Sequence, residues 1–212
     1  MVLTCLAHAE QSMAIQSPLR VEGTFTRTSA DARLNGNELK TTSSAVTGLV
    51  TYYFRKEVFG QLGYGKPTLH RRVVNGEIIP TQSSDTNSLF WYGFGFRSQR
   101  QGSTSDYLGV GFRFSASIGE LEDDNSSKTL RLFSQKDTSQ RFGELEVSIE
   151  SGNNGSINKL GGKHVWFSSN GFGFGFQWAF GSGRNVEDSG DETSYRTRDA
   201  GIVFMYRPKL YK

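Results

Sequence analysis

Residues 171–180, which read GFGFGFQWAF, constrain the fold of this chain more than any other segment. A large aromatic side chain occupies every second position. Successive side chains of a β-strand point to opposite faces, whereas a helix would scatter the same rings around its axis. The segment is therefore predicted to be a strand with one aromatic face, which comprises Phe172, Phe174, Phe176, Trp178 and Phe180.

Neighbouring rings on one face of a strand need an apolar environment, because in water they would promote aggregation. A second sheet could provide that environment only if the outer faces of both sheets were polar, yet the opposite face of this segment is rich in glycine. Glycine suits the crowded interior of a narrow barrel. The pattern therefore favours a barrel whose aromatic faces contact lipid and whose other faces line a narrow lumen.

The composition agrees with a wall that is one strand thick. Hydrophobic residues make up 35% of the chain, below the roughly 45–50% of soluble domains. Aromatic residues nevertheless reach 13%, and the chain has 25 glycines but only 4 prolines. A barrel wall needs apolar residues only at every second position. Because no run of about 18 apolar residues occurs, we expect no spanning helix.

The same period-2 alternation recurs in further segments of about ten residues. These segments are 19–25, 46–54, 58–64, 90–97, 107–116, 144–150 and 199–206. Long polar stretches at 29–42, 67–86, 118–140 and 181–193 largely alternate with short ones at 55–57 and 98–105. Long loops at one end and short turns at the other are typical of outer-membrane barrels.

Between residues 118 and 170, the pattern is compatible with two strand counts. The stretch 151–169 should be a short turn but is not, so either the turn is long or residues 164–168 extend a strand. A further pair of strands that includes 128–133 would give ten. We favour eight, and the predicted fold is an all-β, antiparallel, up-and-down transmembrane barrel.

Seven charged residues fall on the faces predicted to line the lumen. Their mixed signs should pair, since an isolated buried charge is costly. We favour a structural ion-pair network that fills the barrel, and a gate or narrow polar pore remains the alternative. The residues are Arg20, Glu22, Arg97, Arg113, Glu144, Glu146 and Asp199.

The N-terminal residues resemble the end of a secretory signal peptide. Residues 1–6 are largely apolar, and Ala7-His8-Ala9 forms a small-x-small cleavage site. We expect a signal remnant over 1–9, a lead-in over 10–18, the barrel over 19–207 and a tail over 208–212. The chain contains a single cysteine, Cys5, so no disulfide can form within it.

The last alternating segment reads DAGIVFMY and fits the pattern polar-x-Gly-x-x-aromatic-x-aromatic, through Asp199, Gly201, Phe204 and Tyr206. It resembles the terminal β-signal that the barrel assembly machinery recognises. With the other segments, it makes residues 17–207 similar to the small eight-stranded outer-membrane barrels, the OmpA-like and OmpW-like groups. One departure is that such chains usually end on the aromatic residue, whereas RPKLYK follows here.

The resemblance implies a monomer in the outer membrane of a Gram-negative bacterium. Its implied partners are outer-membrane lipids, lipopolysaccharide and, during biogenesis, the assembly machinery. Arg71, Arg72, Arg196 and Arg198 lie near the predicted long loops and either pair with lipopolysaccharide phosphates or are solvated. The formal charge of +3 is spread along the chain, so no nucleic-acid partner is expected.

Some small barrels are lipid A-modifying enzymes or proteases, and a deacylase needs a serine, a histidine and an orienting carboxylate. His70 is predicted in a loop beside two arginines, a poor setting for a general base. His164, near Ser168 and with Glu144 or Glu146 as orienter, is the only candidate. We favour an ordinary interfacial histidine there, and expect no catalytic residue.

No metal or cofactor site is expected either. The acidic run 120–124 lacks the alternating register of a calcium loop, and the two histidines outside the signal remnant are far apart in sequence. The predicted function is therefore a non-enzymatic one, either structural support of the envelope or surface contact through long loops. The alternatives are a narrow pore or small-molecule transporter, a lipid A-modifying enzyme, and a soluble β-barrel binding module.

Overall fold

The computed structural model describes residues 17–34, 37–80, 88–118, 126–152, 155–186 and 192–208. The described chain is built of β-strands joined by turns, and it contains no helix long and apolar enough to cross a membrane. The strands are β1 (Leu19–Leu34), β2 (Asn37–Tyr53), β3 (Val58–Val74), β4 (Glu77–Ile79), β5 (Ser88–Gln99), β6 (Asp106–Ile118), β7 (Ser126–Asp137), β8 (Arg141–Gly152), β9 (Gly155–Phe167), β10 (Phe172–Val186) and β11 (Glu192–Tyr206).

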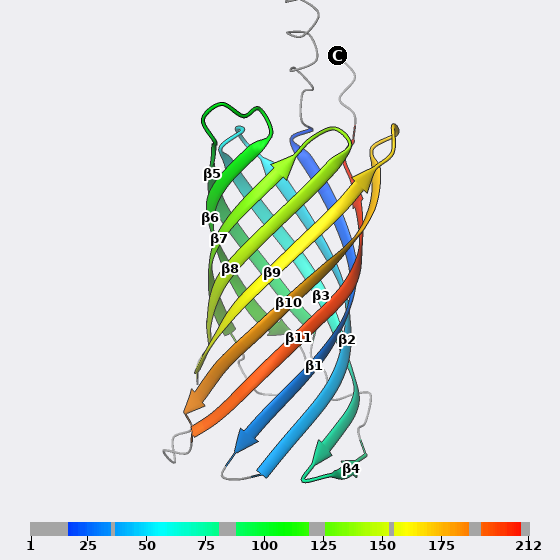
Figure 1. Ribbon diagram of the computed structural model, residues 1–212, viewed down its shortest axis with the longest axis vertical. Coiled ribbons are helices and arrows are strands. Elements are labelled where there is room, and N and C mark those ends of the chain that lie inside the picture. The colour runs from blue at the N-terminus through cyan, green and yellow to red at the C-terminus, as the bar shows by residue number, and fades with distance from the viewer. Residues whose placement is uncertain are drawn as a thin grey trace, which may run out of the picture.

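The strands form one closed antiparallel barrel (Figure 1). Each strand pairs with the next along the chain, except that β3 pairs with β5 past the short strand β4. The ring is closed by β1 and β11, which pair from Val21↔Tyr206 to Leu34↔Thr193. Of the eleven strands, β4 pairs with β3 alone among the described pairings, which leaves ten in the wall.

The prediction of eight strands is therefore wrong, and the ten-strand alternative is correct. The two additional wall strands are β7 and β9. Their outward faces carry few large apolar side chains, because Lys128 and Ser134 flank Leu130 and Leu132 on β7, while Gly162 and His164 interrupt the series on β9. The alternation is present in both strands, but it is diluted by polar and small residues.

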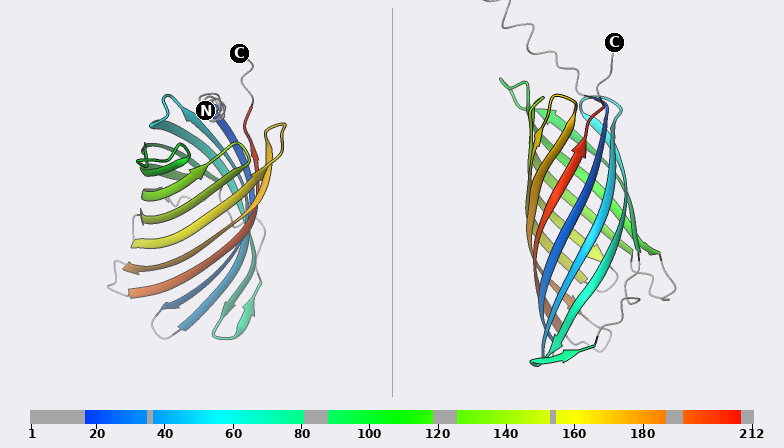
Figure 2. Two further views of the ribbon diagram at one scale, coloured as in Figure 1. Left: turned by 45° about the horizontal axis from the view of Figure 1, so that its top comes forward. Right: turned by 90° about the vertical axis from the view of Figure 1, so that its right-hand side faces the viewer.

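The two ends of the barrel differ in their connections. The links 54–57, 100–105, 138–140 and 168–171 lie at one end, together with the start of β1 and the end of β11; we call this the turn end. The opposite end, called the loop end, has the links 35–36, 75–87, 119–125, 153–154 and 187–191. Figure 1 shows the turn end at the top, and Figure 2 shows the closed wall from two further directions.

Some predicted long loops are in fact strand. Most of the stretch 29–42 belongs to β1 and β2, which are separated by only two residues, and β3 continues through 67–74. Threonine and serine are common in 24–47, and these residues sustain β-structure without apolar alternation. The barrel wall therefore extends further toward the loop end than the aromatic pattern indicates.

Apolar side chains cover the outside of the barrel. Every one of the ten wall strands carries at least two exposed large hydrophobic side chains. On β10, Phe172 is 59% exposed and Phe180 is 55% exposed, whereas Val203 on the inner side of the neighbouring strand is fully buried. The aromatic alternation in the sequence thus marks the outer face, as predicted.

Large inward side chains fill the lumen near the turn end. Phe59 and Phe133 contact each other at a ring-centroid distance of 5.8 Å. Inward glycines make room for these rings: a Cβ atom at Gly95 would lie 2.3 Å from Phe59 Cζ, and one at Gly109 would lie 2.3 Å from Phe133 Cζ. A second buried cluster comprises Phe142, Val165, Val203 and Met205. The turn-end lumen is therefore a packed core.

Candidate functional site: the barrel lumen

All seven charged residues predicted to line the lumen occupy inward positions. Arg20, Glu22 and Arg97 are buried, each at most 4% exposed. Six of the seven line one cavity of about 330 Å³ in the middle of the barrel, and these are Arg20, Glu22, Arg113, Glu144, Glu146 and Asp199. Arg97 lies closer to the turn end, where it lines a different cavity.

Arg131 on β7 is the centre of an ion-pair network that the sequence did not reveal. Its Nε donates to Glu146 Oε2 at 2.7 Å, and its Nη2 lies 3.3 Å from Glu144 Oε1. Across the lumen, its Nη1 donates to Gln61 Oε1 on β3 at 3.2 Å. Arg131 and Phe133 both point inward from β7. The alternation of side chains along residues 128–133 is therefore the sequence signal that could have identified Arg131.

The network continues from Arg131 toward the turn end. Gln135 Nε2 donates to Glu144 Oε2 at 2.5 Å, and Arg97 Nη1 donates to Gln135 Oε1 at 3.3 Å. On the other side of the barrel, Lys163 on β9 forms an ion pair with Glu22 on β1. Contacts between strands that are not neighbours thus cross the lumen in several directions, beside the cavity of about 330 Å³.

Guanidinium groups and aromatic rings occupy the turn end together. Arg97 Cζ lies 4.1 Å from the ring centroids of both Tyr53 and Tyr107. Arg207, just after β11, lies 3.9 Å from the Phe167 ring, and its Nη2 is 2.6 Å from Asp137 Oδ1. Cation–π contacts at these distances are favourable when the groups are desolvated. Burial lowers the pKa of Arg207, and the carboxylate of Asp137 opposes that shift.

The loop end carries polar and charged side chains on its outer face. A hollow of about 690 Å³ lies there on the outside of the wall, because most of its lining residues, such as Arg33 and Lys40, follow the alternation of the outward side chains. Arg33 and Lys40 both pair with Glu38, at 3.3 and 3.5 Å, but all three side chains are exposed. Exposed pairs contribute little to stability. This end therefore presents exposed charge outside the lumen.

The basic residues predicted near long loops lie on strands. Arg71 and Arg72 belong to β3, and Arg196 and Arg198 to β11; all four are exposed near the loop end. Arg198 and Arg196 stand opposite Ser29 and Asp31 of β1. Their pairing with lipid phosphates remains a prediction.

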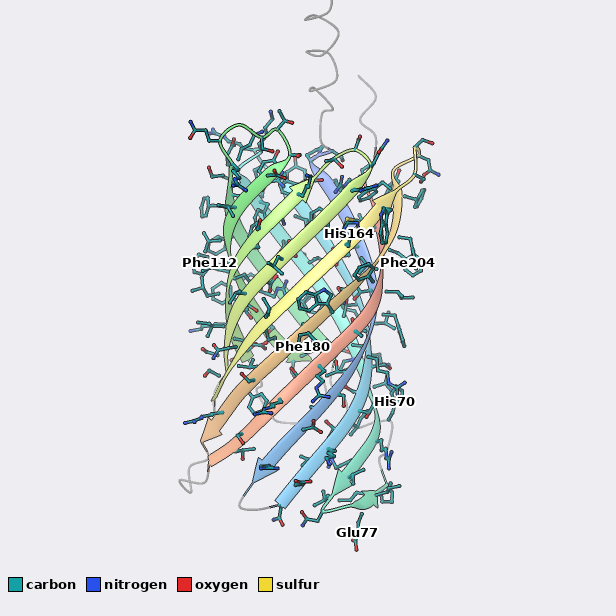
Figure 3. All side chains as sticks on the ribbon, viewed as in Figure 1. His70, Glu77, Phe112, His164, Phe180 and Phe204 are labelled. Atoms are coloured by element: carbon teal, nitrogen blue, oxygen red, sulfur yellow. The ribbon has the colours of Figure 1, made fainter. Side chains whose placement is uncertain are left out.

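The structure separates the residues of the candidate triad around His164, which the sequence did not favour. The His164 ring packs on the outer face, with its centroid 4.4 Å from that of Trp166 and 6.0 Å from that of Phe176 (Figure 3). Glu144 and Glu146 line the lumen, so the barrel wall separates them from His164. Neither carboxylate can orient this imidazole.

His70 has a partner that sequence reasoning missed. It lies in β3 rather than in a loop, at an irregularity in the pairing of β2 with β3, and its Nε2 is 2.7 Å from Ser44 Oγ. A serine–histidine pair supplies two of the three groups of a hydrolytic triad. In the part of the chain that is described, no carboxylate forms a hydrogen bond or an ion pair with His70, so the orienting group is missing.

The residues of the terminal signal pattern lie on the strand that closes the barrel. Phe204 is exposed on the outer face opposite Gly23 of β1, and Asp199 faces the lumen. A Cβ atom at Gly201 would lie 2.5 Å from the carbonyl oxygen of Phe25, so close strand pairing excludes a side chain there. Within the described ranges, no group of three or more His, Cys, Asp or Glu residues could hold a metal ion.

The strand pairing defines the class of protein as a closed ten-stranded antiparallel barrel that is apolar outside and charged inside. No family model and no curated protein sequence matches the chain. Among solved structures, it is similar to the outer-membrane protease OmpT from Escherichia coli, with 7% identity, 92% of this chain and 99% of that chain covered, and a TM-score of 0.49.

Two further similar structures are also barrels of bacteria. The translocator domain of the autotransporter NalP from Neisseria meningitidis shares 10% identity, with 97% and 94% of the two chains covered and a TM-score of 0.44. The toluene transporter TodX from Pseudomonas putida shares 8% identity, with 96% and 93% covered and a TM-score of 0.44.

Proposed function

We propose that this chain is an integral outer-membrane β-barrel of a Gram-negative bacterium, with a non-enzymatic role in envelope structure or surface contact. The observation that carries the proposal is the polarity of the wall. Each strand exposes large hydrophobic side chains, while Arg20, Glu22 and Arg131 are buried inside. This arrangement is the reverse of that in a soluble barrel, and it matches the apolar band of a membrane-spanning one.

The lumen contacts support a role without free conduction. The chain of hydrogen bonds from Arg97 through Gln135 and Glu144 to Arg131 crosses the interior, and Phe59 and Phe133 pack beside it. The cavity of about 330 Å³ that remains in the middle of the barrel is lined by residues of this network. A structural role, or contact through the outer surface, is therefore the function that the geometry favours.

Insertion into lipid tests the membrane proposal. The full chain, refolded into phospholipid vesicles, should float with them in a density gradient and resist extraction by urea. Phe176→Arg places a charge on the outer face and should reduce insertion, at a cost of about 2–4 kcal/mol near the bilayer centre. The matched control is Gln177→Arg, one residue along on the lumen face, which should insert like the unmodified chain.

Two outcomes would contradict the membrane proposal. One is a chain that stays soluble without detergent and does not float with vesicles, which would favour a soluble β-barrel binding module. The other is equal insertion of Phe176→Arg and the unmodified chain, because the outer face would then not contact lipid.

One cavity favours a second candidate, a narrow pore or small-molecule transporter. This cavity has a volume of about 330 Å³ and lies in the middle of the barrel. Planar-bilayer recording of the reconstituted chain separates the candidates. We expect no stepwise conductance from the filled lumen, and regular conductance steps would favour the pore.

A further inference from the structure

Three arginines surround the turn end of the lumen, and they differ in their partners. Arg97 donates from Nε to the carbonyl oxygen of Lys56 at 2.8 Å, and Arg207 donates from Nη1 to the carbonyl oxygen of Thr138 at 2.9 Å. Arg20 is only 4% exposed, yet no described residue accepts a hydrogen bond from its Nε or Nη1. Its guanidinium lies 4.5 Å from the Phe142 ring centroid, a contact that satisfies no N–H donor.

A buried cationic donor without an acceptor is costly, so such a group points to an absent ligand or water. The space for one is present. Arg20 lines a cavity of about 150 Å³ between β1, β2, β5, β7 and the residues after β11. This volume equals that of about five water molecules at roughly 30 Å³ each, enough for a small polyatomic ion.

The charge around this cavity is strongly positive. Arg20, Arg55, Lys56, Arg97 and Arg207 line it with five positive groups, against the single carboxylate of Asp137. That carboxylate is already engaged, since Arg97 Nη1 lies 3.5 Å from its Oδ2 and Arg207 Nη2 lies 2.6 Å from its Oδ1. The lining therefore has an excess of cationic donors.

Two carboxylates near Arg20 have cations of their own. Glu22 pairs with Lys163, and Glu144 accepts from Gln135 and pairs with Arg131. These contacts hold both carboxylates beside the larger cavity of about 330 Å³. Arg20 lines both that cavity and the smaller, basic one at the turn end.

We propose that this cavity binds a small free oxyanion, of the size and charge of inorganic phosphate or sulfate, with Arg20 as its principal ligand. Arginine binds tetrahedral oxyanions through charge-assisted hydrogen bonds, and a desolvated site strengthens them. The rim residues Arg55 and Lys56 are exposed in the β2–β3 turn and would attract the anion. Because the cavity lies inside the wall, a free anion fits it better than a lipid headgroup.

Isothermal titration of the full refolded chain with sodium phosphate tests this site. The chain should be held in an uncharged maltoside detergent, with sodium chloride at matched ionic strength as the reference. We expect saturable binding of one phosphate per barrel, weakened at least tenfold in Arg20→Gln. The matched control is Arg196→Gln at the loop end, which should bind phosphate like the unmodified chain.

A double variant keeps the test decisive if Arg20→Gln does not refold. Arg55→Gln with Lys56→Gln changes only exposed rim residues, and several-fold weaker phosphate binding by this variant supports the site. Glycerol phosphate, which represents a lipid headgroup, is titrated in parallel. Tighter binding of glycerol phosphate than of inorganic phosphate would contradict the proposal that the ligand is a free anion. Absence of saturable binding by the unmodified chain, or unchanged binding in the variants that refold, would overturn the proposal.

Discussion

The turn end and the loop end belong to one barrel, yet ion pairs are buried at the turn end and exposed at the loop end. At the turn end, the inward positions carry large rings such as Phe59, Phe133 and Phe142, and guanidinium groups lie over Phe133 and Phe142. At the loop end, Arg33, Glu38 and Lys40 form exposed ion pairs, and the hollow of about 690 Å³ beside them lies on the outside of the wall.

The comparison shows that strand alternation alone does not decide where a barrel is packed. The period-2 pattern assigns a residue to the lumen, but the volume of that residue determines whether the lumen fills. Stability should therefore be concentrated at the turn end and in the middle of the barrel, and the exposed contacts of the loop end should contribute less. Substitutions in the two regions test this contrast.

The largest expected effect follows loss of Arg131. Arg131→Met leaves the buried side chain of Glu144 and the partly buried one of Glu146 without their main cation, and removal of one partner from a buried ion pair costs about 3–5 kcal/mol. Urea unfolding of the detergent-refolded chain measures this cost. The loop-end control Lys40→Met removes an exposed pair with Glu38 and should change stability by less than about 1 kcal/mol. Equal costs would contradict the contrast between the two regions.

A core truncation at the turn end should be nearly as severe. Phe142 is fully buried and packs with Val165, Val203 and Met205, so Phe142→Ala should cost about 3 kcal/mol through lost contacts and the cavity left behind. The same unfolding measurement applies, with Tyr195→Ala on the loop-end half of β11 as the comparison. A cost for Phe142→Ala below that for Tyr195→Ala would show that the turn end is not the packed region.

Glycine substitutions provide a matched pair with a smaller effect. A Cβ atom at Gly109 would lie 2.3 Å from Phe133 Cζ and 2.6 Å from the carbonyl oxygen of Phe96, so Gly109→Ala should destabilise the barrel by about 1–3 kcal/mol. On the outer face of β1, Gly23 has no described atom within 4 Å of the same position. Gly23→Ala should be close to neutral, and equal effects of the two substitutions on the unfolding midpoint would argue against a crowded turn-end lumen.

The smallest effect is expected at the serine–histidine pair on the β2–β3 wall. Ser44→Ala removes one hydrogen bond to His70, which contributes about 0.5–1.5 kcal/mol to stability. Without an orienting carboxylate among the described residues, we also expect no ester hydrolysis by the unmodified chain. Hydrolysis of lipid A or a chromogenic ester that disappears in Ser44→Ala would make the enzyme alternative the better one.

The sequence predicts the wall strands with the strongest aromatic faces but misses the weaker ones. Residues 171–180 alternate so regularly that strand and outer face follow directly. In β9, by contrast, the outward positions include Asn158, Gly162 and His164, which do not form an apolar series. Hydrophobic periodicity detects a lipid-facing strand only when the outward residues are large and apolar.

The sequence predicts which charged residues face the lumen, but it does not predict which of them pair with each other. The alternation along each strand assigns Glu22 and Glu144 to the interior. Their partners Lys163 and Arg131, however, lie on β9 and β7, the two strands that the eight-strand prediction omits. Which charges meet across a barrel depends on strand number and register, and both are set by closure of the whole sheet. Arg207 was likewise missed, because its position beyond the last strand gives no alternation to follow.

The central claim, a closed membrane-spanning barrel, is tested most directly by the gel mobility of the refolded chain with and without boiling in SDS. A closed barrel offers no free strand edge at which unfolding can start, so it should resist SDS while cold and migrate differently from the boiled chain. We expect this boil-dependent shift, with a larger fraction of the cold sample in the shifted band for the unmodified chain than for Arg131→Met. Identical mobility of the cold and boiled samples, with a chain that is soluble in plain buffer, would contradict it.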